Sequence, residues 1–96
     1  MDGEAKRKLR ARAQQLGVGA TIGKDGLTEG ALEEVRRQLE EQRLLKVRLL
    51  ASAREGQTRE DLARELAEGC AADLVEVRGN TVVLWRGKAT RRRAPG

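Results

Sequence analysis

Glycines and one lysine cluster in the stretch "GVGATIGKDG", residues 17–26, and stretches of this kind can hold phosphate groups. A Walker A loop requires two glycines five positions apart, followed by Lys and then by Ser or Thr. Here Val18 stands five positions before Gly23, and Asp25 takes the place of the hydroxyl residue. A dinucleotide-binding G-x-G-x-x-G motif fails too, because Ile22 stands where its third glycine belongs. The stretch therefore does not predict a nucleotide-binding enzyme.

Other catalytic arrangements find no better support in this sequence. It contains no histidine, so the usual acid–base group at neutral pH and the commonest zinc ligand are missing. The single cysteine, Cys70, falls on the apolar side of an expected helix, which favours a structural thiol over a nucleophile. Most carboxylates occupy solvent-facing helical positions and are expected to form intrahelical ion pairs, as in Glu33–Arg37 and Glu60–Arg64. We therefore predict a protein that is not an enzyme and that needs no cofactor or metal.

The segment Gly23-Lys24-Asp25-Gly26 offers a different chemistry, because it lies between an expected strand and an expected helix. Two glycines three positions apart allow a tight turn and leave room for another backbone to approach. The helix that follows points free amides and the positive end of its dipole toward the turn, and Lys24 adds a charge. A GxxG turn clamps the backbone of single-stranded RNA in KH modules. The alternative is a glycine-rich turn with no ligand.

Hydrophobic periodicity predicts the elements that must position this segment. Helices are expected over residues 5–16, over 29–42 after an N-cap at Thr28, and from an N-cap at Thr58 to about Gly69. Strands are expected over residues 18–22, 44–50, 74–78 and 81–86, with a loop at 52–57 and a tight Gly79-Asn80 turn. The order α-β-α-β-α-β-β predicts an α/β fold of the two-layer α+β kind, in which three helices cover one mixed four-stranded sheet.

Lysines and arginines concentrate at the two ends of the chain, whose formal net charge is +5. Residues 1–26 carry six of them against three acids, residues 70–96 six against two, and residues 27–69 eight against ten. Basic ends favour a polyanionic partner such as RNA or DNA. The cations expected to contact the phosphates of such a partner, besides Lys24, are Lys6, Arg7, Lys8, Arg10 and Arg12 on the first helix and Lys46 and Arg48 on one strand. The two strand residues have an alternative, which is to be solvated or paired with helix acids.

The remaining observations concern the ends of the domain and the compartment. Residues 5–87 are expected to form one domain, and residues 88–96, which include three consecutive arginines, a flexible basic tail. Trp85 is expected to pack in the core or at its rim, with base stacking as the alternative. The chain has no long apolar run, its first residues do not resemble a secretory signal, and a lone cysteine fits a reducing interior. We expect a cytoplasmic monomer that does not bind membranes.

The stretch "IGKDGLTEGALEEVRRQLEEQRLLKVRL", followed by "LAEGCAADLVEVRGNTVVLWR", resembles the YhbY family, whose unit is the CRM (chloroplast RNA splicing and ribosome maturation) domain. The matching features are the G-x-x-G-L-T-E-G run from Gly23, the L-x-K-V strand from Leu44, and "VRGNTVVLWR". The resemblance covers roughly residues 5–87. Asp25 departs from the pattern in charge, because its carboxylate lies at a tip meant for phosphate. Gly19 and Ala20 replace bulkier strand residues, and Trp85 stands where Tyr is common.

The resemblance implies a fold similar to the C-terminal domain of bacterial translation initiation factor three. It also implies RNA binding through the GxxG loop (residues 23–26) and the adjacent basic surface, without catalysis. Plant relatives act in intron splicing, and stand-alone copies look like factors in ribosome biogenesis that associate with ribosomal RNA of the large-subunit precursor. Two rival functions remain: a nucleoid-type DNA-binding protein, and a protein-interaction adaptor on the ribosome that docks through the acidic helix at residues 29–42.

Overall fold

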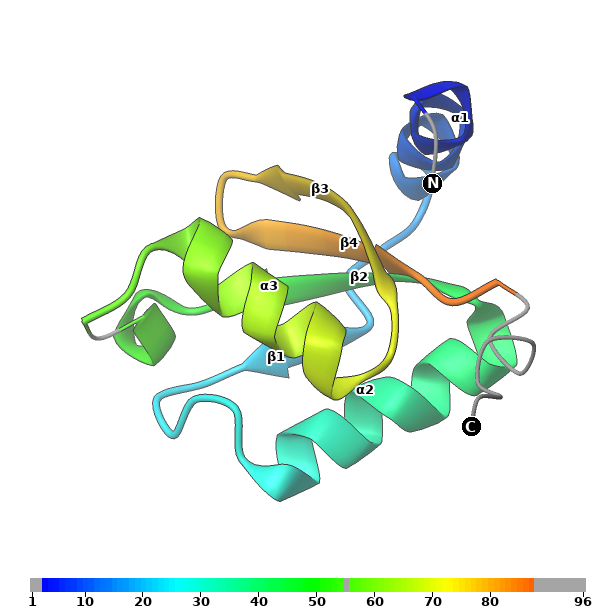
Figure 1. Cartoon of the computed structure of the whole chain (residues 1–96). Coiled ribbons are helices and arrows are strands. Elements are labelled where there is room, and N and C mark those ends of the chain that lie inside the picture. The colour runs from blue at the N-terminus through cyan, green and yellow to red at the C-terminus, as the bar shows by residue number, and fades with distance from the viewer. Residues whose placement is uncertain (1–2, 55, 88–96) are drawn as a thin grey trace.

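The order of helices and strands predicted from the sequence is confirmed in the computed structural model, which describes residues 3–54 and 56–87 (Figure 1). The expected tail at residues 88–96 lies outside the described residues. The elements are, in chain order, α1 (Gly3–Ala13), β1 (Ala20–Ile22), α2 (Glu29–Gln42), β2 (Leu44–Leu49), the short 3-10 helix η1 (Ala51–Arg54), α3 (Arg59–Gly69), β3 (Asp73–Arg78) and β4 (Thr81–Trp85).

Three local expectations differ from the structure. The first helix, expected over residues 5–16, begins at Gly3 and ends at Ala13. The expected loop at residues 52–57 begins with η1, because Ala53 donates its N–H to the Leu50 carbonyl and buries its side chain in the core. The first strand is also shorter than expected. Val18 is exposed, and Gly19 donates its N–H to the Lys46 carbonyl at 2.9 Å before regular pairing starts.

The strands form one mixed sheet in the order β1-β2-β4-β3. β1 and β2 are parallel, with Ala20 opposite Val47, and α2 provides the crossover between them. The β3–β4 hairpin is antiparallel and turns at Gly79-Asn80 as predicted. It folds back so that the last strand, β4, lies between β2 and β3. This central position explains why the run "VVLW" of β4 is apolar on both faces.

The main core lies between one face of the sheet and the two helices α2 and α3. Leu39 of α2, Leu66 of α3 and Leu84 of β4 are fully buried there. Both predicted N-caps are confirmed: the hydroxyls of Thr28 and Thr58 accept from the N–H groups of the residues three positions ahead, at 3.1 and 3.0 Å. The caps fix where the two helices begin.

The predicted ion pairs of α2 and α3 are wrong in their partners. Arg37 pairs with Glu34 at 2.7 Å and with Glu41 at 3.6 Å, and Arg64 pairs with Asp61 at 2.7 Å. Side chains three positions apart on a helix can form an ion pair as well as those four apart. Arg37 and Arg64 therefore pair with other acids than the expected Glu33 and Glu60. Because Arg37 donates to Glu34, the pKa of the Glu34 carboxyl lies below its usual value.

The helix α1 covers part of the opposite face of the sheet, away from α2 and α3 (Figure 1). Its two buried residues pack on a second, smaller cluster that contains Leu9, Ala13, Leu44, Val75 and Val83. A register shift between Leu74 and Glu76 makes this packing possible, because the bulge turns both Val75 and Glu76 toward α1. Glu76 then forms an ion pair with Arg10 at 3.2 Å. No helix of residues 3–54 and 56–87 has the length and apolar character of a membrane span.

Candidate nucleic-acid interface

The GxxG segment is a tight turn that leads from the end of β1 toward α2 (Figure 1). Gly26 donates its N–H to the Gly23 carbonyl at 3.0 Å, and its φ of 72° lies in the left-handed region that favours glycine. A Cβ added at either glycine would meet no atom within 4 Å. The outer side of the turn is therefore open to another molecule. Gly26 is required by its backbone conformation, whereas Gly23 keeps its backbone uncovered.

The first turn of α2 presents backbone donors next to this segment. The Thr28 hydroxyl accepts from Ala31, and the Thr28 carbonyl accepts from Leu32. Within the part of the chain that the structure describes, the N–H groups of Glu29 and Gly30 have no hydrogen-bond partner. Free amides at the positive end of a helix dipole suit a phosphate group.

The side chains at the tip of the turn are both exposed, and their charges cancel. Neither Lys24 nor Asp25 has an ion pair among the described residues. Glu29, in the first turn of α2, is paired with Arg36 at 3.4 Å. Attraction for an anion at this turn thus rests on the amides, the helix dipole and Lys24, with Asp25 opposing them.

A row of polar side chains crosses the sheet next to the turn, on the face that α1 partly covers. The strand register places Thr21, Arg48, Thr81 and Arg78 side by side across all four strands. Arg48 and Arg78 are exposed. Arg78 is not among the cations predicted from the sequence to contact a ligand. The sequence could have predicted its position from the two-residue Gly79-Asn80 turn. Such a turn sets Arg78 opposite Thr81, so the two side chains lie on the same face of the sheet.

Lys46 occupies the same face as Arg48 but has a partner inside the protein. Its Nζ donates to the Leu16 carbonyl at 2.9 Å, and the side chain is partly buried. Arg48 has no ion pair or hydrogen bond from its side chain among the described residues. The two cations that the sequence places together therefore differ in role: Lys46 fastens the chain beyond α1, and Arg48 is available to a ligand.

Of the five cations of α1, two contact other side chains of the protein and three are exposed or partly exposed among the described residues. Arg10 is paired with Glu76, and the guanidinium of Arg12 lies 5.7 Å from the centroid of the Trp85 ring. Arg7 and Lys8 are exposed, and Lys6 is partly exposed. Trp85 is half-buried and packs against the second cluster, in agreement with the expected rim position.

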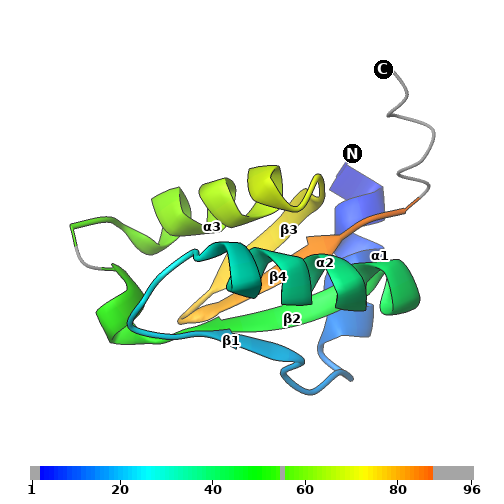
Figure 2. The ribbon, with the colours of Figure 1, turned by 90° about the horizontal axis from the view of Figure 1, so that it is seen from below.

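The predicted site residues fall on two separate surfaces. We call residues 23–26 with Arg48 the loop surface, and Lys6, Arg7, Lys8, Arg10 and Arg12 the α1 surface. The turn after β1 and the helix α1 lie at opposite ends of the molecule in both views of the ribbon (Figures 1 and 2). A single RNA phosphate cannot bridge them, so one continuous contact would have to run across the sheet face.

Cys70 lies at the C-terminal end of α3, fully buried against α2. Burial raises the pKa of its thiol, which keeps it protonated. No group of three or more His, Cys, Asp or Glu side chains in residues 3–54 and 56–87 is arranged to hold a metal ion. The Sγ atom donates to the Leu32 carbonyl of α2 at 3.8 Å, so the thiol contacts α2 within the core.

Comparison with known proteins identifies the family. A family model described as the CRS1 / YhbY (CRM) domain matches residues 1–86. The chain belongs to this family, as the resemblance predicted.

Two relatives and one solved structure extend this result. The chain is 37% identical over 86 residues to Probable RNA-binding protein MJ0652 of Methanocaldococcus jannaschii, a match that covers 90% of this chain but only 63% of that protein. It is 33% identical over 86 residues to Probable RNA-binding protein YqeI of Bacillus subtilis, covering 90% and 88% of the two chains. The fold is similar to the solution structure of the hypothetical protein SAV1595 from Staphylococcus aureus, with a TM-score of 0.74, 28% identity, and 92% and 90% of the two chains covered.

Proposed function

We propose that this protein binds RNA through the loop surface, without catalysis, and acts in the assembly of the large ribosomal subunit on precursor ribosomal RNA. The turn at residues 23–26 and the first amides of α2 would hold a phosphodiester backbone. Arg48, at the same end of the sheet, adds a charge for a neighbouring phosphate. Contacts of this kind position an RNA and do not read its bases.

The observation that carries the proposal is the family match, whose relatives named above are called RNA-binding proteins. The open GxxG turn supports it, because both glycines leave the backbone uncovered at the start of a helix. The adaptor alternative receives less support. The acids of α2 that face solvent are partly neutralised within the helix, where Arg36 and Arg37 pair with Glu29, Glu34 and Glu41.

The test is a binding titration with a fluorescently labelled fragment of large-subunit ribosomal RNA and with duplex DNA of equal length, over a potassium chloride series. Lys24→Asp places a second carboxylate at the tip of the turn. We expect it to weaken RNA binding by about tenfold and to reduce the salt slope by about one. Arg64→Asp is the matched control, because it makes the same charge change on the solvent side of α3.

The results separate the proposal from its rivals once circular dichroism shows that both variants fold. Preferred binding of RNA, lost in Lys24→Asp and kept in Arg64→Asp, supports the loop surface as the site. Equal binding of RNA and DNA supports a nucleoid-type protein. RNA binding that is the same in wild type and Lys24→Asp contradicts a role for the turn.

A further inference from the structure

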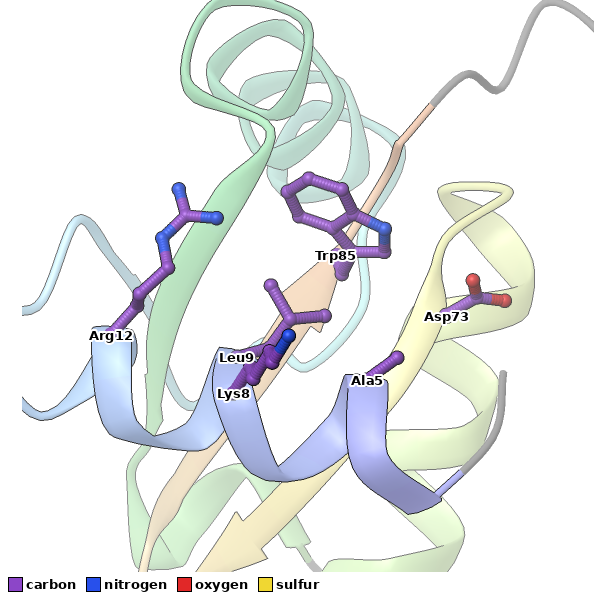
Figure 3. Close-up of a pocket in the computed structure, with 6 residues that line it drawn as sticks. All are labelled: Ala5, Lys8, Leu9, Arg12, Asp73 and Trp85. Atoms are coloured by element: carbon purple, nitrogen blue, oxygen red, sulfur yellow. The ribbon is translucent and has the colours of Figure 1, made fainter.

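A pocket of about 450 Å³ opens between α1 and the β3–β4 hairpin (Figure 3). The helix α1 lies at the end of the molecule away from the turn after β1 (Figure 1). It is lined by Ala5, Lys8, Leu9, Arg12, Asp73 and Trp85. Its volume is in the range of sites that take small molecules or single nucleotides. Neither the loop surface nor the family match accounts for it.

The inner walls of the pocket are apolar and well supported. Leu9 belongs to the second cluster, and the Trp85 ring packs against the same cluster while remaining half-buried. A Cβ at Gly87 would come within 2.7 Å of the Trp85 Nε1 atom, so the chain passes close along that edge of the ring. The ring is thus held in place, and its remaining surface faces the pocket.

Charged groups stand around the ring on different sides. Figure 3 shows Arg12 on one side of Trp85 and Asp73 on the other, with Lys8 extending from α1 between them. The Arg12 guanidinium lies 5.7 Å from the ring centroid, and Lys8 is exposed. Two cations and a carboxylate around an aromatic wall complement a nucleotide, which combines a flat base, an anionic phosphate and exocyclic amino groups.

We propose that this pocket binds one unpaired nucleobase of an RNA strand, stacked on Trp85. A base that enters takes the place of the Arg12 guanidinium over the ring. Arg12 and Lys8 then contact the flanking phosphates, and the Asp73 carboxylate accepts a hydrogen bond from an exocyclic amino group. The inference rests on the proposed RNA binding and adds a second contact, at the far end of the molecule, that recognises single-stranded RNA.

The charge arrangement favours RNA over a peptide as the occupant. An apolar peptide side chain could fill the same walls, but it would bring no anion for Lys8 and Arg12. A nucleotide satisfies the ring and both cations at once. A peptide ligand would therefore appear in the test as binding that does not depend on bases.

Trp85 provides the readout, because it is the chain's only aromatic residue and the sole source of intrinsic fluorescence. The probes are a short single-stranded oligoadenylate and an abasic oligonucleotide with the same number of phosphates. We expect oligoadenylate to quench the fluorescence in a saturable way. The abasic strand should bind at least about fivefold more weakly and leave the fluorescence unchanged.

Two variants at the ring and a matched pair on α1 complete the test. Affinities are measured by the anisotropy of a labelled oligonucleotide, because Trp85→Leu has no intrinsic fluorescence. Trp85→Leu, which keeps an apolar side chain on the cluster, should bind oligoadenylate about fivefold to a hundredfold more weakly, whereas Trp85→Tyr should retain most of the affinity. Lys8→Glu should weaken binding more than Arg7→Glu, which makes the same charge change one residue away without lining the pocket. The ribosomal RNA fragment that binds through the loop surface is titrated in parallel.

The outcomes distinguish this inference from the proposed function. Unchanged fluorescence with oligoadenylate that does bind, or equal affinity of wild type and folded Trp85→Leu, overturns the base pocket. In that case, sensitivity of the ribosomal RNA fragment to Lys24→Asp leaves the proposed function standing. If the wild type binds no RNA at all, the proposed function itself fails. Quenching that requires bases and depends on residue 85 supports the pocket.

Discussion

The two surfaces proposed to bind RNA lie at opposite ends of this domain and carry different binding groups. At the loop surface the binding groups are mainly backbone amides at the start of α2, and the side chains at the tip of the turn cancel in charge. At the α1 surface the groups are cationic side chains, of which Lys8 and Arg12 stand beside the Trp85 ring. Amides suit phosphates, which every nucleotide carries, whereas a ring suits an unpaired base. Under the two proposals, we therefore expect the loop surface to bind any RNA backbone and the pocket at Trp85 to prefer single strands.

The loop surface and the α1 surface also differ in the hydrophobic packing beneath them. The loop surface stands on the main core, where residues of α2, α3 and the sheet are fully buried. The α1 surface stands on a cluster of five buried residues with the pocket beside it.

The largest expected effect is on stability, from truncating one leucine on each side of the sheet. Leu39→Ala should lower the free energy of unfolding by about 4 kcal/mol, because its side chain is fully enclosed. Leu9→Ala should lower it by about 2 kcal/mol, because the small cluster next to an open pocket can collapse. Urea denaturation followed by far-ultraviolet circular dichroism measures both. Equal losses would contradict the difference in support.

A smaller effect is expected at the two glycines of the turn. Gly26→Ala should destabilise the fold by about 1 kcal/mol, since an alanine at a φ of 72° is strained although space is open. Gly23→Ala should leave stability unchanged or raise it by about 0.5 kcal/mol, because its φ is not positive. Both methyl groups should weaken binding of the ribosomal RNA fragment. If Gly26→Ala weakened RNA binding while Gly23→Ala, which stays as stable as the wild type, bound RNA normally, the turn would not contact RNA.

The two cations of β2, Lys46 and Arg48, are expected to contribute to different properties, the first to stability and the second to RNA affinity. Lys46→Met removes the hydrogen bond to the Leu16 carbonyl and should cost about 1 kcal/mol of stability. Arg48→Met should leave stability within about 0.5 kcal/mol of the wild type, because Arg48 is exposed. RNA binding should show the reverse order, with the larger loss in Arg48→Met. Thermal unfolding and the RNA titration, run on the same preparations, compare the two.

The smallest effect is a pH dependence from the surface of α2. The hydrogen bond from Arg37 lowers the pKa of Glu34 from its ordinary 4.5 in the folded state. Stability from this pair is therefore present above pH 4.5 and is lost as the pH falls through the lowered pKa. Glu34→Gln should reduce the unfolding midpoint slightly at neutral pH, and the difference from the wild type should shrink in acid. A difference that persists in acid would point to Gln38, which also donates to Glu34.

Local rules were enough to predict the elements and the turn. Thr28 and Thr58 cap their helices, Gly79-Asn80 closes its hairpin, and the glycines of the GxxG segment turn the chain after β1. Each of these features depends on residues close in sequence, because a cap or a tight turn is satisfied within about one helical turn. The buried faces of α2 and α3 followed from periodicity for the same reason.

The arrangement of the cations was decided by contacts between residues far apart in the chain. Lys46 meets Leu16 across 30 positions, and the bulge at Val75 turns Glu76 toward Arg10. The pocket at Trp85 exists only because α1 packs on the face of the sheet opposite to α2. Periodicity states that a helix has an apolar side but not which face of the sheet that side covers. Short-range patterns therefore specify the turn at residues 23–26, because its glycines act on their own backbone. Packing between distant segments places Lys8 and Arg12 of α1 beside the Trp85 ring at the other end of the molecule.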